Sequence, residues 1–268
     1  MTPPPLGLYS IGIRGLDTSE LLAAAARWQV PFVHLRGGPR GSDLARVPAA
    51  RLAAWARQAR DVGVPVTMVT ADIDVAEFNT PGTARYRQAA GEFAALAAAA
   101  GELGARAIRL LARAVPREAE WGTLAVPVDT VDTVPGMAVL AELHDPGWFT
   151  PAAAARLCSL LNRTPGLALL LDSAQVHDAW LRDPAVSWPG LLADLAERAS
   201  FVHLSDRGSG LDGAGHQLAA RAVRDAAGIG HHAEAAFEWT GTERSPQACL
   251  ARYRAAAAWH AARWEESP

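Results

Sequence analysis

Short apolar runs alternate along the chain with longer stretches that are rich in alanine, leucine and arginine. Several of the short runs are almost continuously apolar, for example residues 167–171, which is typical of strands buried on both faces of a parallel sheet. The longer stretches have the composition of helices. We therefore predict eight strands that alternate with helices, and place the strands at residues 6–13, 31–35, 65–70, 107–111, 137–143, 167–172, 200–204 and 232–239.

Helix start signals agree with this alternation. Asp17 and Glu20 have the spacing of a capping box, and Thr150 and Ser245 each stand directly before a proline, as N-cap residues do. Eight βα units in 268 residues predict an α/β fold, a single (β/α)8 TIM barrel that spans residues 1–268. An open doubly wound sheet would need a glycine-rich phosphate loop after its first strand, and residues 12–15 do not have the G-x-G-x-x-G pattern.

Charge and residue usage narrow the classes of function. All 25 basic residues are arginine, which excludes lysine chemistry, and 28 acidic residues leave a net charge of −3, which argues against nucleic acid as a partner. No apolar run reaches the roughly 18 residues that a membrane span needs, and the N-terminus has no basic and apolar leader. The two cysteines, Cys158 and Cys249, are widely spaced, as is common in a reducing compartment. We therefore expect a cytoplasmic protein without a membrane partner.

The chemistry of a barrel lies at the carboxyl ends of its strands. Each of the last four predicted strands carries an acid or an imidazole there, namely Glu142, Asp172, His203 and Glu238. Such groups are costly in buried strands unless they are paired or bind a cation. Three carboxylates and one imidazole predict a site for one divalent metal ion, Mn²⁺ or Mg²⁺ before Co²⁺ or Zn²⁺.

The same strand ends resemble a known family. The helix end and turn at residues 101–109, and the segments 141–145, 170–175, 201–206 and 212–215, are similar in order and spacing to motifs of the xylose isomerase-like TIM-barrel superfamily. This group contains sugar phosphate isomerases and epimerases, and also the type IV apurinic endonucleases. The resemblance implies a metal held by Glu142, Asp172, His203 and a glutamate of the last strand, which we assign to Glu238, with Glu234 as the alternative.

The resemblance also implies a reaction. A divalent metal polarises the carbonyl of a small sugar or keto-polyol, and an α-proton is then moved through an enediolate by Glu142 and Glu238. An isomerase or epimerase is the expected activity. A dehydratase that expels a hydroxyl from the same enediolate, and a non-catalytic ligand-binding barrel, are the alternatives.

Two departures from the family pattern keep these alternatives open. Gln175 stands where the family often has a histidine, and the end of the third predicted strand, residues 68–72, has none. The further histidines of a three-zinc endonuclease are also missing, so we do not expect a role in DNA repair.

Polar and aromatic residues near the strand ends are candidates for binding a small polyhydroxylated substrate. The set is His34, Arg36, His144, Asp206, Arg207 and Trp239. Arg36 has the geometry to bind a carboxylate or phosphate through two nitrogens, and Asp206 could orient a metal ligand. We expect Asp72 and Asp74 to form turns and His177 to face solvent. A homo-oligomer is compatible with the sequence but nothing in it specifies one.

Overall fold

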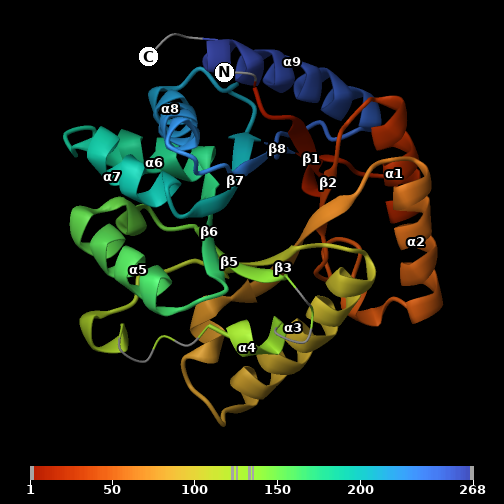
Figure 1. The fold of residues 1–268 in the computed structure, drawn as a ribbon, viewed down its shortest axis with the longest axis horizontal. Coiled ribbons are helices and arrows are strands. Elements are labelled where there is room, and N and C mark those ends of the chain that lie inside the picture. The colour runs from red at the N-terminus through yellow and green to blue at the C-terminus, as the bar shows by residue number, and fades with distance from the viewer. Residues whose placement is uncertain (1–2, 122–123, 125, 132–133, 135, 266–268) are drawn as a thin grey trace.

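The computed structural model describes residues 3–121, 124, 126–131, 134 and 136–265. Eight parallel strands form a closed barrel in which each strand pairs with the next one along the chain and β8 pairs with β1 (Figure 1). The predicted barrel is therefore confirmed. The strands are β1 (Leu6–Tyr9), β2 (Val33–Arg36), β3 (Val66–Asp74), β4 (Ala107–Ala112), β5 (Ala138–Leu143), β6 (Leu167–Asp172), β7 (Ala199–Asp206) and β8 (Glu234–Trp239).

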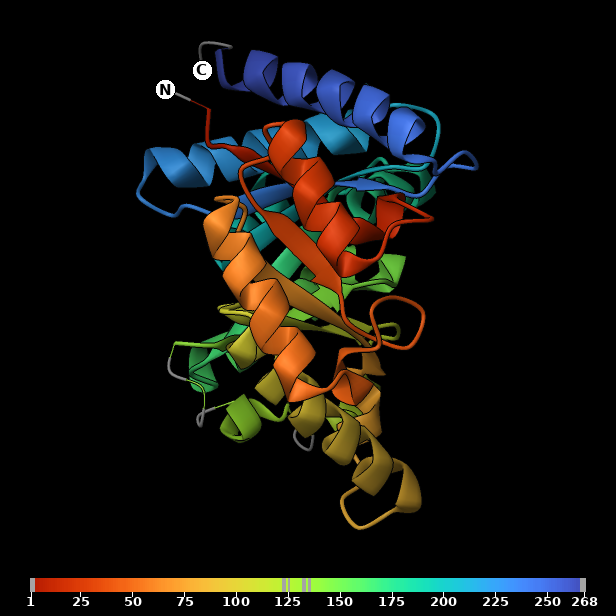
Figure 2. The ribbon, with the colours of Figure 1, turned by 90° about the vertical axis from the view of Figure 1, so that its right-hand side faces the viewer.

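Helices surround the barrel, and Figure 2 shows α1 and α2 along one of its sides, with α9 crossing one end of the view. The chain forms α1 (Thr18–Arg27), α2 (Ala49–Asp61), α3 (Ala84–Glu102), α4 (Val128–Val131), α5 (Pro151–Arg163), α6 (Ser173–Arg182), α7 (Trp188–Ala196), α8 (Ala214–Gly228) and α9 (Pro246–Glu265). Short 3-10 helices are η1 (Ser10–Gly12), η2 (Leu44–Arg46), η3 (Val75–Phe78), η4 (Glu118–Glu120) and η5 (Pro146–Phe149). The capping box at Asp17 and the cap at Thr150 are present. In the described part of the chain, no helix is both long and apolar enough to cross a bilayer.

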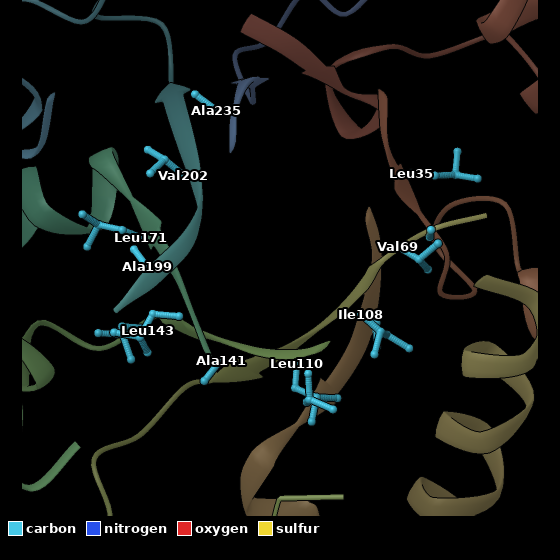
Figure 3. Close-up of a cluster of buried hydrophobic side chains, with 14 of the residues drawn as sticks. Leu35, Val69, Ile108, Leu110, Ala141, Leu143, Leu171, Ala199, Val202 and Ala235 are labelled. Atoms are coloured by element: carbon cyan, nitrogen blue, oxygen red, sulfur yellow. The ribbon is translucent and has the colours of Figure 1, made fainter. Parts of the chain in front are cut away.

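Two apolar layers hold the barrel. The outer layer packs the strands against the helices, and Figure 3 shows part of it, including Leu35, Ile108 and Leu171. The second is a small cluster made of Met68, Ala107, Leu140, Leu170 and Phe201. Because successive side chains of a strand point to opposite faces, the outward Leu171 leaves its neighbour Asp172 inside the barrel.

The strand ends differ from the predicted ones at two places that matter for the site. β1 ends at Tyr9, and the next residues form η1 instead of continuing the strand to residue 13. β3 continues to Asp74, so Asp72 lies within a strand and was wrongly expected to form a turn. Asp72 instead accepts hydrogen bonds from Arg36 and Arg40, and Asp74 caps η3.

Candidate metal centre

Four side chains from four consecutive strands meet at the carboxyl end of the barrel. Glu142, Asp172, His203 and Glu238 are all buried, and each offers one ligand atom, all of which lie within 4.8 Å of one another. Asp172 pairs in register with His203, and the last strand brings Glu238 beside Ser205. The convergence expected from the sequence is therefore present in the fold, while the binding of a metal by these groups stays a prediction.

The carboxylate of Asp172 is held by the start of α6. Its Oδ1 accepts hydrogen bonds from the backbone N–H groups of Ala174 (2.8 Å) and Gln175 (3.0 Å). Its Oδ2 contacts Ser205 Oγ, which also lies 3.2 Å from Glu238 Oε2. Ser205 thus joins two carboxylates, although it has only one proton to donate. Sequence analysis missed it, and the signal was its place two residues after His203 on the same strand face.

A chain of hydrogen bonds inside the barrel orients His203. His34 Nδ1 lies 3.0 Å from His203 Nε2, and His34 Nε2 lies 2.9 Å from Glu234 Oε1. Burial lowers the pKa of both imidazoles to about 4, so both are neutral at pH 7. The Glu234 carboxylate only accepts, so the proton of His34 lies on Nε2 and its Nδ1 accepts from His203 Nε2. His203 Nδ1 is then unprotonated, 3.0 Å from Glu238 Oε2.

These contacts correct one expectation and bear on another. His34 is fully buried with both nitrogens used by protein groups, so the predicted substrate contact at His34 is wrong. Glu234, the alternative ligand of the last strand, accepts hydrogen bonds from His34, Thr67 and Arg106. It is outside the group of side chains that meet around His203.

A buried arginine stands beside the four side chains, and sequence analysis did not single it out. Arg109 Nε lies 2.7 Å from Glu142 Oε2, and its other nitrogens donate to Ala71 O (2.8 Å) and Tyr9 Oη (3.2 Å). It is the one charged residue in the otherwise apolar β4, and that isolation was the available signal. Burial by itself would raise the pKa of Glu142, but Arg109 and His144 lower it to about 2.

The remaining carboxylates are short of positive charge. Burial and the charges of Glu238 and Glu142 raise the pKa of Asp172 to about 7, and burial and Glu142 raise that of Glu238 to about 7. With Arg109 balancing one of three carboxylates, full ionisation leaves two negative charges in a buried space. A divalent cation would neutralise them.

Two buried atoms support such an ion directly. Glu142 Oε2 and His203 Nδ1 make no hydrogen bond with any described residue, although charged groups lie close to both. Buried polar atoms are rarely left without a hydrogen bond. Three carboxylates and one imidazole are a donor set that divalent cations accept, so the residues present fit the metal.

The other predicted substrate residues fall into two groups. His144 and Arg36 lie at the rim. His144 Nε2 is 3.2 Å from Glu142 Oε2, and its Nδ1 is 3.4 Å from Gln175 Nε2. Arg36 pairs with Asp72 at 3.3 Å and keeps 16% of its side chain exposed. Substrate contact by these two residues stays a prediction.

The second group is engaged in building loops. Asp206 accepts hydrogen bonds from the backbone of Gly208 (2.7 Å) and Gly210 (2.9 Å), and buried Trp239 donates to Glu243 O at 2.6 Å. Substrate contact by Asp206 and Trp239 stays a prediction, since these hydrogen bonds engage the indole N–H of Trp239 and one carboxylate oxygen of Asp206. Arg207 forms an ion pair with Asp178, and its substrate role stays a prediction.

His177 also differs from its expected position. It lies in α6, its ring centroid is 4.8 Å from that of His216, and its Nδ1 is buried without a hydrogen bond to any described residue. His177 is half-buried, and not fully open to solvent as expected, because α8 packs on α6.

The fold and the site define the class of protein: a closed (β/α)8 barrel with an acidic and imidazole centre at the carboxyl ends of β5 to β8. No protein-family model matches the sequence, and no curated protein matches it. Solved structures do share the fold, and among them are sugar epimerases and proteins described as containing a xylose isomerase domain.

Three of these structures cover nearly the whole chain. A D-psicose 3-epimerase with D-tagatose from Clostridium cellulolyticum H10 has 14% identity and a TM-score of 0.70, with 100% of both chains covered. The IolI protein with a bound zinc atom has 12% identity and a TM-score of 0.72, again over 100% of both chains. The 3-keto-D-glucoside 4-epimerase YcjR from E. coli has 16% identity and a TM-score of 0.67, over 96% of this chain and 98% of its own.

Proposed function

We propose that this protein is a divalent-metal-dependent isomerase or epimerase that acts on a small sugar or keto-polyol. The observation that carries the proposal is the buried meeting of Glu142, Asp172, His203 and Glu238, with two of their ligand atoms lacking hydrogen bonds. Groups of this kind are seldom buried together unless a cation compensates them.

We assign Mn²⁺ or Mg²⁺ to the site, with Co²⁺ and Zn²⁺ as alternatives. The donor set is mainly carboxylate oxygen, which favours the harder ions. Zinc is kept because the IolI structure carries a zinc atom in the same fold. When bound, the metal would act as a Lewis acid on the substrate carbonyl.

Side chains of the protein would carry out the other parts of the reaction. Glu142 and Glu238 come from β5 and β8 and would remove and return the α-proton of the substrate. Arg109 keeps Glu142 ionised, as the low pKa of that carboxyl indicates. His144 is partly exposed beside Glu142 and would contact the substrate hydroxyls. The neighbours that are 3-epimerases and a 4-epimerase of sugars support proton transfer as the reaction type.

Proton exchange tests the proposal without knowledge of the final product. The protein, reconstituted with Mn²⁺, Mg²⁺, Co²⁺ or Zn²⁺, is incubated in D2O with D-psicose, D-tagatose and L-ribulose, and deuterium at the α-carbon is followed by NMR. We expect exchange and an isomeric product that differs from the substrate in mass only by the deuterium it has gained, and neither with Glu142→Gln. Loss of water would indicate a dehydratase. Metal binding without exchange on any sugar would indicate a ligand-binding barrel.

A further inference from the structure

A cavity of about 630 Å³ lies over the segments that follow β8, β1 and β2. These three strands are neighbours in the closed barrel, as Figure 1 shows. Its charged lining consists of five arginines and one aspartate, namely Arg14, Arg36, Arg40, Arg51, Arg244 and Asp17. The chain as a whole carries a net charge of −3, so this arginine pocket opposes the average charge of the protein.

Arg244 is fixed in the pocket without an acidic partner. Its guanidinium donates to the backbone carbonyls of Gly241 (2.9 Å), Thr240 (2.8 Å) and Ile11 (3.4 Å). Among the residues that the structure describes, no carboxylate pairs with it. Burial and the nearby Arg14 charge lower the pKa of Arg244. The backbone carbonyls and the more distant charge of Glu238 offset only part of the cost of holding this cation, because the net shift of its pKa is downward.

Arg14 is a second arginine of the pocket without an acidic partner, and its residue is exposed to solvent. Its side chain makes no hydrogen bond or ion pair with any described residue. The other three arginines share two acids: Arg51 lies 3.4 Å from Asp17, and Arg36 and Arg40 both pair with Asp72. Five guanidinium groups thus face two carboxylates, which leaves an excess of positive charge in one cavity.

The pocket also offers hydroxyl groups. Thr18 Oγ1 and Ser42 Oγ lie 2.9 Å apart in its lining, and Ser10 Oγ accepts from the N–H of Arg36. Guanidinium forks with nearby hydroxyls are the donors that recognise carboxylate and phosphate oxygens.

β8 leads from the metal centre toward the pocket, although none of the four converging side chains is among the residues that line it. Glu238 precedes Arg244 by six residues, and the charge of Glu238 acts on the Arg244 guanidinium. In many barrels a phosphate site is formed by the loops after the seventh and eighth strands; here the donors follow the eighth, first and second. A substrate that reaches from Glu238 into the pocket would therefore meet cations at its far end.

We propose that the arginine pocket binds the anionic end, a phosphate ester or a carboxylate, of a sugar whose carbonyl lies at the metal centre. The part of this proposal that places the sugar carbonyl at the metal centre rests on the proposed function. Arg14 and Arg244 make the decisive contacts, because neither is already paired with an acid in the described chain.

Calorimetry on the metal-reconstituted protein tests the anion site alone. The probes are inorganic phosphate, D-gluconate and, as a neutral polyol of the same length, sorbitol. We expect phosphate or gluconate to bind and sorbitol to bind at least tenfold more weakly. Arg14→Gln and Arg244→Gln should each lower the affinity for the anion by about tenfold or more, which is the scale of a lost hydrogen bond to a charged group. Arg163→Gln, an exposed arginine of α5, should leave it unchanged.

The two anion probes separate the sources, since binding of phosphate alone indicates a sugar phosphate and binding of gluconate alone indicates a sugar acid. Absence of binding by both, or equal binding by wild type and the two variants, would overturn the proposal. Arg14→Gln removes no contact seen in the fold, so a failure of this variant to bind is not a failure to fold.

Turnover distinguishes this inference from the proposed function. Anion binding that depends on Arg14 and Arg244, with no exchange on any neutral or anionic sugar, would support the pocket and contradict the isomerase. Exchange on neutral ketoses that is equal in wild type and Arg14→Gln, with no anion binding, would support the isomerase and contradict the pocket.

Discussion

His34 Nδ1 lies 3.0 Å from His203 Nε2 inside the barrel, and this contact determines which nitrogen of His203 faces the three carboxylates. Glu234 completes the chain by accepting from His34 Nε2. Hydrogen bonds of this kind to the far nitrogen of a metal-binding histidine set its tautomer and orientation. His34 is thus a positioning residue for the proposed metal centre.

Replacement of His34 should weaken metal binding without removing a ligand. For His34→Phe we expect the affinity for Mn²⁺ to fall about 10- to 100-fold, which is the usual cost of losing a partner behind a ligand. Calorimetry gives the affinity, and ¹⁵N NMR of the metal-free protein should show the His203 proton on Nε2 in wild type but distributed between both nitrogens in the variant. An unchanged affinity in a folded variant would contradict the role.

Metal removal and loss of Glu142 should have the same effect on catalysis. Dialysis against a chelator should abolish α-proton exchange, and Mn²⁺ should restore it. Glu142→Gln should abolish exchange even with metal added, because the amide is not a base. Circular dichroism checks that the variant is folded, and Glu102→Gln, an exposed glutamate of α3, serves as the control. Substantial exchange by Glu142→Gln would remove Glu142 from the mechanism.

Replacement of each of the two glutamates of β8 should have a different effect on the metal content of the protein. Glu238→Gln should lose the metal, because Glu238 is one of the four converging groups. Glu234→Gln should retain a stoichiometric metal at reduced affinity, because Glu234 acts through His34. Elemental analysis of both purified variants after equal dialysis makes the comparison. The reverse order of metal loss would show Glu234 to be the ligand.

Arg109 should contribute most to the free energy of unfolding when the metal is absent. Removing one member of a buried ion pair costs about 3–5 kcal/mol, because the remaining charge is left uncompensated. We expect Arg109→Met to lose stability on this scale in urea unfolding of the metal-free protein. Addition of Mn²⁺ should raise the stability of the variant more than that of wild type, since the cation then also attracts the carboxylate that Arg109 balances in wild type. Equal gains in both proteins would contradict this charge balance.

His216 should contribute to acid sensitivity. Burial and the neighbouring His177 lower the pKa of His216 from 6.5 to about 4. Between these two values the unfolded chain binds a proton that the folded chain does not, so this group lowers the free energy of unfolding as the pH falls from 6.5 to 4. His216→Asn should therefore show a smaller loss of stability over this range in urea titrations. An equal pH dependence in both proteins would exclude the contribution.

The sequence by itself was enough to predict the barrel and the convergence of Glu142, Asp172 and His203 with a glutamate of the last strand. Apolar runs with a two-residue alternation specify which side chains point inward, and a parallel barrel places all strand ends at one rim. Glu142, Asp172 and His203 could therefore be identified from strand position before any contact was known.

Only the tertiary structure shows that Glu238 lies with the other three side chains, whereas Glu234, on the same strand face, is about 13 Å away along the strand. It also revealed Arg109 and the contact of His34 with His203, two interactions between distant strands. The physical reason is that the two-residue periodicity of a strand assigns each side chain to a face of the sheet. Its contacts depend instead on the register between neighbouring strands, which sets how far along the barrel axis each residue lies. The closed barrel fixes this register for all eight strands together, and it thereby also fixes the charge balance of the site.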